Sequence, residues 1–298
     1  MTRTGSGPVL TLERPRKPGW RLARHLMLAG GLLLGATMGA SHAGTTDWSS
    51  HDEAMRTRLI TGVMDQPVKG LDGQVIAWQA DMNSGWKTYW RSPGEAGLPV
   101  RVRVNGTPVD LRYPVPRKFT LFGITTYGYG DQVVMPFRLP EGVSGDSLTI
   151  EAEFMACKDV CLPFKQQYTL NRDQLGSGDP VADVTLNAWA DRLPDVQGGA
   201  GAGLAIDGAR VVGPKGHQRL IVDASAGQSL DGARLLVECD GIQFAPATVQ
   251  LRGDGTSARF VVPVMRQGET VHDLNGRDVR LTLVRGDGQA IERDRSLG

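Results

Sequence analysis

The sequence predicts an all-β protein made of two antiparallel β-sandwiches, joined by a linker with one short helix. Short segments of alternating apolar and polar residues recur along most of the chain. Glycine and proline residues separate these segments, and only one stretch has the apolar spacing of an amphipathic helix. The size and punctuation of both groups of segments are typical of immunoglobulin-like sandwiches.

Residues 1–43 are predicted to be a cleavable signal peptide. A basic leader precedes the uncharged residues 26–40, and Ser41-His42-Ala43 then places small residues at the positions that a signal peptidase reads. The apolar stretch of 15 residues is shorter than the roughly 20 that cross a bilayer as a helix. We therefore expect export to the periplasm, with an uncleaved anchor as the alternative.

The charge of the remaining chain gives no reason to expect a nucleic-acid partner. Of 33 basic and 32 acidic residues, the leader holds six and one, which leaves 27 and 31 and a net charge of −4. Nucleic-acid binding needs a clustered basic face, and the sequence has no such cluster.

Residues 44–172 are predicted to form the first sandwich. Pro136 interrupts one candidate strand, which places that strand at a sheet edge or a bulge. The candidate strands are 55–63, 73–81, 86–91, 100–104, 133–139, 148–155 and 163–170.

Residues 173–203 are predicted to connect the two sandwiches. Asp183 to Leu193 has the only helical pattern, Pro194 ends it, and the glycine-rich residues 198–203 follow.

Residues 204–298 are predicted to form a second, smaller sandwich, with a frayed polar end at residues 292–298. Its candidate strands are 204–213, 218–225, 233–240, 247–253, 257–265 and 278–286.

The chemistry of the chain is concentrated in its cysteines, of which there are three: Cys157, Cys161 and Cys239. Residues four apart in a continuing strand lie about 13 Å apart, whereas a disulfide needs Cα atoms within about 7 Å. A hairpin with a three-residue loop brings Cys157 and Cys161 opposite one another. The sequence therefore predicts a disulfide-competent hairpin tip.

A redox role is favoured for this pair over a structural or a metal-binding one. A bridge that closes so short a loop stabilises the fold little, and the spacing offers two of the four ligands that zinc requires. Lys158 favours a thiolate on its neighbours, and Asp159 opposes it. Cys239 alternates with apolar residues, so we expect a buried and inert thiol.

Four motifs of the first sandwich, together with their order and spacing, resemble one protein family. They are GWKTYWRSPGEAGLP at 85–99, YPVPRKF at 113–119, YGYGDQVVMPF at 127–137 and CKDVCLP at 157–163. The resemblance covers about residues 50–172 and is to the N-terminal periplasmic domain of the thiol:disulfide interchange protein DsbD family, more closely to its relative ScsB, the suppressor-of-copper-sensitivity protein. Residues 204–298 are similar only loosely.

The resemblance implies an immunoglobulin-like sandwich that carries Cys157 and Cys161 as its redox pair, with no cofactor besides this redox-active disulfide. Electrons are implied to arrive from a membrane-embedded thiol donor and to leave to periplasmic thioredoxin-like or disulfide isomerase proteins. The family's membrane domain and thioredoxin-like domain are not in this sequence, so we expect the donor to be a separate protein unless the chain is a piece of a longer one. By position, Cys161 is expected to form the mixed disulfide.

Family members shield the cysteine pair with an aromatic loop. Tyr127 and Tyr129 are as compatible with ordinary packing as with capping, and core packing is favoured for Trp78, Trp86 and Trp90. The residues expected to cap or surround the pair are Phe122, Tyr127, Tyr129, Asp131, Tyr89 and Trp90, with Lys158 and Asp159 between the cysteines.

Two other functions remain open at this point. The same thiolates, with a soft ligand from Met82, Met135 or Met155, could bind Cu(I) in a copper-tolerance module. Alternatively, two sandwiches with an incidental disulfide could serve a purely structural or interaction role.

Overall fold

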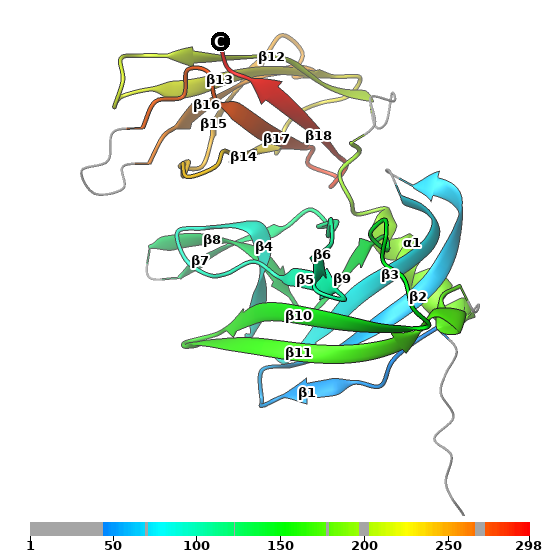
Figure 1. Ribbon diagram of the computed structural model, residues 1–298. Coiled ribbons are helices and arrows are strands. Elements are labelled where there is room, and N and C mark those ends of the chain that lie inside the picture. The colour runs from blue at the N-terminus through cyan, green and yellow to red at the C-terminus, as the bar shows by residue number, and fades with distance from the viewer. Residues whose placement is uncertain (1–43, 69–70, 122, 177–178, 197–202, 266–271) are drawn as a thin grey trace, which may run out of the picture. The chain divides into compact units, whose positions relative to one another are not determined.

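Antiparallel strands dominate the computed structural model, which describes residues 44–68, 71–121, 123–176, 179–196, 203–265 and 272–298. The predicted signal peptide and the glycine-rich residues 198–202 lie outside the described residues. Within them, α1 is the one α-helix, and the remaining elements are strands and a single 3₁₀ turn (Figure 1). The prediction of an all-β fold is therefore confirmed.

One sheet of the first sandwich has the strand order β1-β2-β3-β9. Its strands are β1 (Ser49–His51), β2 (Met55–Val68), β3 (Leu71–Met82) and β9 (Gln132–Phe137). Pro136 lies on β9 at the edge of this sheet, where the missing N–H of proline removes no ladder hydrogen bond from a central strand.

The other sheet of the first sandwich has the order β6-β5-β10-β4-β8-β7, and β11 pairs with β10. Because β10 alternates between buried and more exposed residues as far as Ala156, one of its faces packs inward and the other points outward. The strands are β4 (Lys87–Gly94), β5 (Arg101–Val104), β6 (Thr107–Pro108), β7 (Arg117–Leu121), β8 (Ile124–Gly130), β10 (Ser147–Cys157) and β11 (Cys161–Asn171).

Aromatic and aliphatic side chains from both sheets form the first core. The rings of Trp78 on β3 and Phe154 on β10 have centroids 5.1 Å apart and join the two layers. Trp78, Trp86 and Trp90 are all at most 6% exposed, as the core interpretation predicts.

The helix α1, Pro180–Ala190, starts three residues earlier than the predicted span 183–193. Asp179 caps it by accepting the N–H of Val181, and proline suits the first helical position because its missing N–H would have no partner there. Leu186 and Trp189 belong to the first core, so this segment packs on the first sandwich as well as connecting it onward. Among the described residues, no helix combines the length and the apolar character that spanning a bilayer requires.

The second sandwich has a four-stranded sheet, β12-β13-β16-β15, and a three-stranded sheet, β14-β17-β18. Phe260 and Leu281 lie in the core between these sheets. The strands are β12 (Leu204–Val212), β13 (Arg219–Ala226), β14 (Arg234–Glu238), β15 (Thr248–Arg252), β16 (Ser257–Pro263), β17 (Asp278–Val284) and β18 (Ala290–Ser296).

The polar end of the chain is a strand and not the frayed segment that its composition suggests. β18 pairs with β17 along its whole length, from Val284↔Ala290 to Asp278↔Ser296. Cross-strand ion pairs, such as Arg280 with Asp294 at 2.9 Å, let a charged sequence occupy a sheet edge. Composition alone does not reveal such a partner strand.

Candidate redox site

The candidate site lies at the tip of the β10–β11 hairpin. The two strands pair without a register shift from Ser147↔Asn171 to Cys157↔Cys161, which places the cysteines directly opposite one another. Their Cα atoms are 4.2 Å apart and their sulfurs form a disulfide. The intervening loop closes with a hydrogen bond from the Lys158 N–H to the Val160 carbonyl at 3.1 Å. The hairpin bridge that the spacing predicts is therefore present.

The two cysteines differ sharply in exposure. Cys157 is 2% exposed, whereas Cys161 is an exposed residue. The difference follows from the sheet, because β10 has neighbours on both sides while β11 is paired on one side only among the described residues. A partner molecule can therefore reach the sulfur of Cys161 more readily than that of Cys157.

Strand β4 covers the buried side of the pair. Lys87 is the register partner of Cys157, and the Thr88 hydroxyl donates to the Met155 carbonyl at 2.9 Å. Tyr89 follows two residues after Lys87, so both side chains project from the face that carries the disulfide. Burial lowers the pKa of Lys87, whose ammonium donates to the Thr126 hydroxyl at 3.0 Å.

Tyr89 is the polar side chain in contact with the disulfide. Its hydroxyl lies 3.8 Å from the Cys161 sulfur and can only donate, because a disulfide sulfur carries no hydrogen. The Tyr89 side chain is 2% exposed, and this burial raises its pKa, so the hydroxyl keeps its proton at neutral pH. The prediction that Tyr89 lies near the pair agrees with this contact.

The backbone at Gly97 covers the Tyr89 ring. Gly97 has a φ of 107°, and a Cβ built there would lie 2.4 Å from the ring of Tyr89. Only glycine allows both this conformation and this approach. Leu98 follows directly and is 54% exposed. The motif at 85–99 includes this segment, but nothing in its sequence pattern indicates that it packs on Tyr89.

The two described tyrosines of the expected aromatic cap, Tyr127 and Tyr129, do not lie over the disulfide. Phe122 lies outside the described residues. Tyr129 is 4% exposed in the core, and its hydroxyl donates to the Pro114 carbonyl at 2.7 Å. Tyr127 is partly buried and packs edge-on against Trp90, with ring centroids 6.4 Å apart. Both tyrosines therefore pack inside the fold and not over the disulfide.

The physical reason is the alternation of glycine and tyrosine along β8. Gly128 is the register partner of Tyr89, and Gly130 is the partner of Lys87, so the glycines lie on the face of the disulfide. A Cβ at Gly128 would lie 2.1 Å from the Thr88 carbonyl oxygen, which shows how closely β8 and β4 approach. Since side chains alternate along a strand, Tyr127 and Tyr129 point to the opposite face.

The other residues of the predicted surround are dispersed. Trp90 is 2% exposed in the core, on the opposite face of β4 from Tyr89. Asp131, in the turn between β8 and β9, has an 86% exposed side chain and binds Arg117 at 3.0 Å. Lys158 and Asp159 are exposed in the hairpin loop.

The soft ligands considered for copper do not gather at the pair. Met135 and Met82 are buried in the first core, at 0% and 7% exposure. Met155 is the register partner of Pro163 and is the one of the three on the strand that carries Cys157. Cys239 is a half-buried free thiol in the second sandwich, less buried than predicted. Among the described residues, no group of three or more histidine, cysteine, aspartate or glutamate side chains could hold a metal ion.

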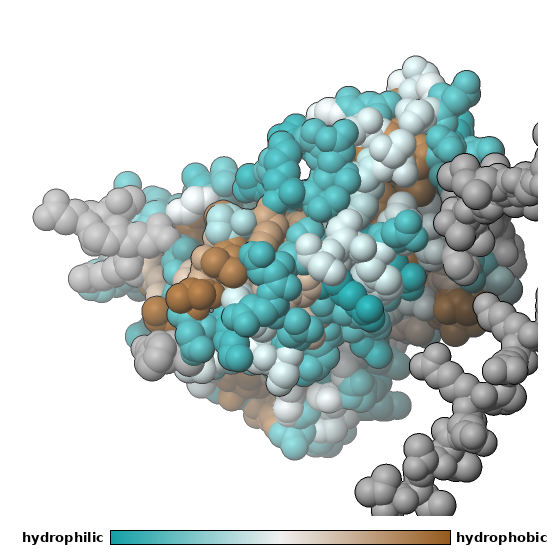
Figure 2. Space-filling model, turned by 90° about the horizontal axis from the view of Figure 1, so that it is seen from below, coloured by the Kyte–Doolittle hydropathy of each residue, from teal (hydrophilic) through white to brown (hydrophobic). Residues whose placement is uncertain are grey.

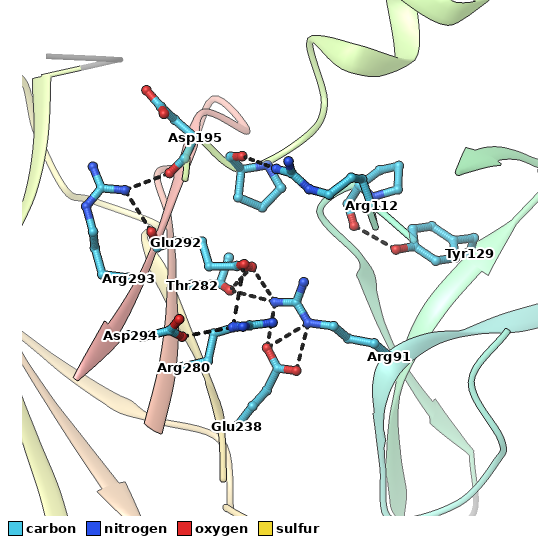
Figure 3. A network of polar contacts seen from close by, with 12 residues as sticks. Arg91, Arg112, Tyr129, Asp195, Glu238, Arg280, Thr282, Glu292, Arg293 and Asp294 are labelled. Carbon is cyan, nitrogen blue, oxygen red and sulfur yellow. Dashed lines mark hydrogen bonds and ion pairs between the residues drawn. The ribbon is translucent and has the colours of Figure 1, made fainter. Parts of the chain in front are cut away.

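Arg91 on β4 connects the strand that carries Tyr89 to the second sandwich (Figure 3). Its guanidinium donates to both carboxylate oxygens of Glu238 at 2.7–3.0 Å, and also to Glu292 and Thr282. Burial disfavours the charge, but the hydrogen bonds and charges of Glu238 and Glu292 outweigh this and raise the pKa of Arg91. The guanidinium therefore stays ionised in this partly buried position.

Comparisons with known proteins agree with the geometry of the site. Residues 66–173 match the family described as thiol:disulfide interchange protein DsbD, N-terminal. The fold is similar to the crystal structure of the N-terminal periplasmic domain of ScsB from Proteus mirabilis, with a TM-score of 0.68 and 19% identity over 86% of this chain and 99% of that chain. A marsupial T cell receptor aligns with a TM-score of only 0.21 at 10% identity, which carries no argument.

No curated protein sequence matches the chain. At 19% identity the likeness to ScsB shows the fold, whereas the family match covers both cysteines, Tyr89 and most of the strands that position them. Residues 66–173 therefore match the family of DsbD N-terminal thiol:disulfide interchange domains, and the chain has the fold of the ScsB N-terminal periplasmic domain.

Proposed function

We propose that this chain is a periplasmic thiol–disulfide oxidoreductase that acts as a relay. The Cys157–Cys161 pair takes reducing equivalents from a membrane-embedded thiol donor and passes them to periplasmic thioredoxin-like or disulfide isomerase proteins. The observation that carries the proposal is the asymmetry of the bridge, with an exposed Cys161 that contacts Tyr89 and a buried Cys157. The family match supports the same chemistry, and the export signal predicted in residues 1–43 supports the compartment.

The exchange needs no cofactor other than the two cysteines. In the reduced protein, the Cys161 thiolate attacks one sulfur of the partner's disulfide, and the partner's other sulfur leaves as a thiolate. The Cys157 thiolate then attacks the Cys161 sulfur of this mixed disulfide, which reforms the Cys157–Cys161 bond and releases the partner as a dithiol. The partner gains two electrons and two protons, and the membrane donor restores both by the reverse sequence.

The tyrosine beside Cys161 fits this assignment of roles. A hydrogen bond from the Tyr89 hydroxyl stabilises the thiolate of Cys161 in preference to the neutral thiol, because hydrogen bonds to charged acceptors are the stronger ones. Cys157 is shielded, so it serves to resolve the mixed disulfide. Copper binding by the same thiolates is less well supported, because of the three candidate methionines only Met155 is outside the buried core.

Trapping of the mixed disulfide tests the proposal. Both variants carry Cys239→Ser, so that no third thiol interferes. Reduced Cys157→Ser, mixed with an oxidised thioredoxin-fold protein, should accumulate a covalent complex, because the resolving thiol is gone. Reduced Cys161→Ser should form about tenfold less of the complex, since its remaining thiol is buried. Non-reducing electrophoresis and intact mass spectrometry measure both yields.

Two outcomes would contradict the proposal. If neither variant forms a complex, the pair does not exchange with proteins of this class. If the two variants react equally, the exposed cysteine is not the attacking one.

A further inference from the structure

A shallow groove lies on the first sandwich, between the segment that follows Gly97 and the strands of the β10–β11 hairpin. Its volume is about 300 Å³. Most of its lining is apolar, and the apolar residues are Leu98, Pro99, Phe154, Pro163 and Phe164. We call this feature the Leu98 groove. It contains none of the residues that carry out the exchange chemistry.

The Leu98 groove and the exchange site share strands β10 and β11. Pro163 follows Cys161 by two residues on β11, so both project from the same face, about 7 Å apart along the strand. On the other side of Cys161, Val160 is 62% exposed. A protein that forms a mixed disulfide with Cys161 must cover this surface, because a sulfur–sulfur bond brings the two chains together.

The edge of β11 favours docking by side chains and not by an added strand. Among the described residues, β11 has a partner on one side only, and an open edge usually invites backbone pairing. Pro163 has no N–H to offer at this point of the edge. A partner that binds next to Cys161 therefore meets the apolar Leu98 groove and a strand edge that lacks one backbone donor.

The charges around the groove are balanced. Lys165 lies 3.4 Å from both Glu151 and Glu153, and Arg101 is the register partner of Glu153. Two basic and two acidic side chains give little net field to attract a charged segment. Figure 2 views the molecule from the side of β1 and β11, and apolar groups there are interspersed with hydrophilic ones.

We propose that the Leu98 groove is the docking site for the protein partner of the disulfide exchange, and that it receives an apolar side chain that flanks the partner's reactive cysteine. The inference rests on the proposed exchange function and adds how the partner is recognised. The volume lies at the small end for a ligand pocket, and it suits one or two side chains. Apolar contact beside the reacting sulfurs positions the partner for in-line attack on Cys161.

The test compares two leucines of similar exposure in the full oxidised chain. Leu98 is 54% exposed in the groove, and Leu251 on β15 is 45% exposed in the second sandwich. Leu98→Asn should slow reduction by a reduced thioredoxin-fold protein about fivefold or more, and should leave reduction by dithiothreitol unchanged. Leu251→Asn should change neither rate. Stopped-flow tryptophan fluorescence follows both reactions.

The salt dependence of the protein reaction gives a second readout. With a balanced rim, raising the salt from about 0.05 M to about 0.5 M should change the rate less than about threefold. A steeper fall of the rate with salt would mean that the partner is recognised by charge and would overturn the inference of apolar docking.

The outcomes separate this inference from the proposed function. If the unmodified protein exchanges with the thioredoxin-fold protein and Leu98→Asn does so at the same rate, the groove is not the docking site. A parallel loss of the dithiothreitol rate in Leu98→Asn would also overturn it, because Leu98 would then act on the disulfide itself. If the unmodified protein is reduced by dithiothreitol and not by the protein partner, the exchange function fails, and the docking site fails with it.

Discussion

At the scale of single residues, the environment of Cys161 determines how the pair can react. Cys161 is an exposed residue, and the Tyr89 hydroxyl lies 3.8 Å from its sulfur. Asp159 and Lys158 are close in sequence but are exposed, so water screens their influence. The Tyr89 hydroxyl is buried and has a raised pKa, so it can donate a hydrogen bond to the Cys161 thiolate without competition from bulk water. Its effect on Cys161 is therefore more specific than that of the two exposed charges.

Tyr89→Phe tests this hydrogen bond. Loss of the donor should raise the pKa of the Cys161 thiol and slow its alkylation at neutral pH about fivefold, which corresponds to about 1 kcal/mol. Tyr113→Phe is the matched control, because that hydroxyl donates to the Val100 carbonyl. The pH dependence of iodoacetamide labelling measures both variants. Equal labelling profiles in Tyr89→Phe and the unmodified protein would exclude the role.

At the scale of elements, the glycines of β8 leave space for the site where β8 approaches β4 closely. Gly128 stands opposite Tyr89, so no side chain competes with the tyrosine ring on that face. The neighbouring tyrosines pack inward and help to hold the strand in place: Tyr129 bonds to Pro114, and Tyr127 packs on Trp90. Because glycine and tyrosine alternate along β8, one face of the strand contributes side chains to the core and the other leaves space beside the disulfide.

Gly128→Ala should destabilise the first sandwich by about 2 kcal/mol, because its Cβ would lie 2.1 Å from the Thr88 carbonyl oxygen and force the strands apart. Gly208→Ala on β12 is the control, since a Cβ there meets nothing within 4 Å. Urea denaturation followed by tryptophan fluorescence gives the free energy of unfolding of each variant. A cost below about 0.5 kcal/mol for Gly128→Ala would contradict the close approach.

At the scale of the whole molecule, the second sandwich is bonded to the strand and segment that form the site. Arg91 lies two residues from Tyr89 and binds Glu238 and Glu292 (Figure 3). The Gln243 amide donates to the Gly94 carbonyl at 3.2 Å, at the start of the segment that covers Tyr89. Since residues 204–298 supply these partners, the second sandwich supports the redox site while contributing no reacting group to it.

Arg91→Gln should lower the free energy of unfolding by about 3 kcal/mol, because it leaves two partly buried carboxylates without their cation. Arg117→Gln should cost less than about 1 kcal/mol, because its ion pair with Asp131 is exposed. Urea denaturation of the full chain measures both changes. Similar costs for the two variants would mean that the Arg91 network does not stabilise the molecule.

The sequence predicts the positions of the strands better than it predicts which strands lie next to one another. All seven candidate strands of the first sandwich and all six of the second coincide with strands of the structure. The weakly patterned strands β1, β6, β7 and β8 were not predicted, since three are very short or polar and β8 has glycine at alternate positions. The composition of β18 predicts a frayed end, and the pairing with β17 explains why these charged residues form a strand instead.

The sequence by itself determined the all-β fold, the cysteine pair at a hairpin tip and the resemblance to the DsbD family, because each depends on local periodicity, spacing or motif order. Only the tertiary structure decided that Cys161 is the exposed member of the pair, that the Tyr89 hydroxyl contacts its sulfur while Tyr127 and Tyr129 pack inward, and that a groove lies on the same two strands. The physical reason is that alternation along a strand tells which residues share a face, whereas burial depends on which distant strand lies across from them.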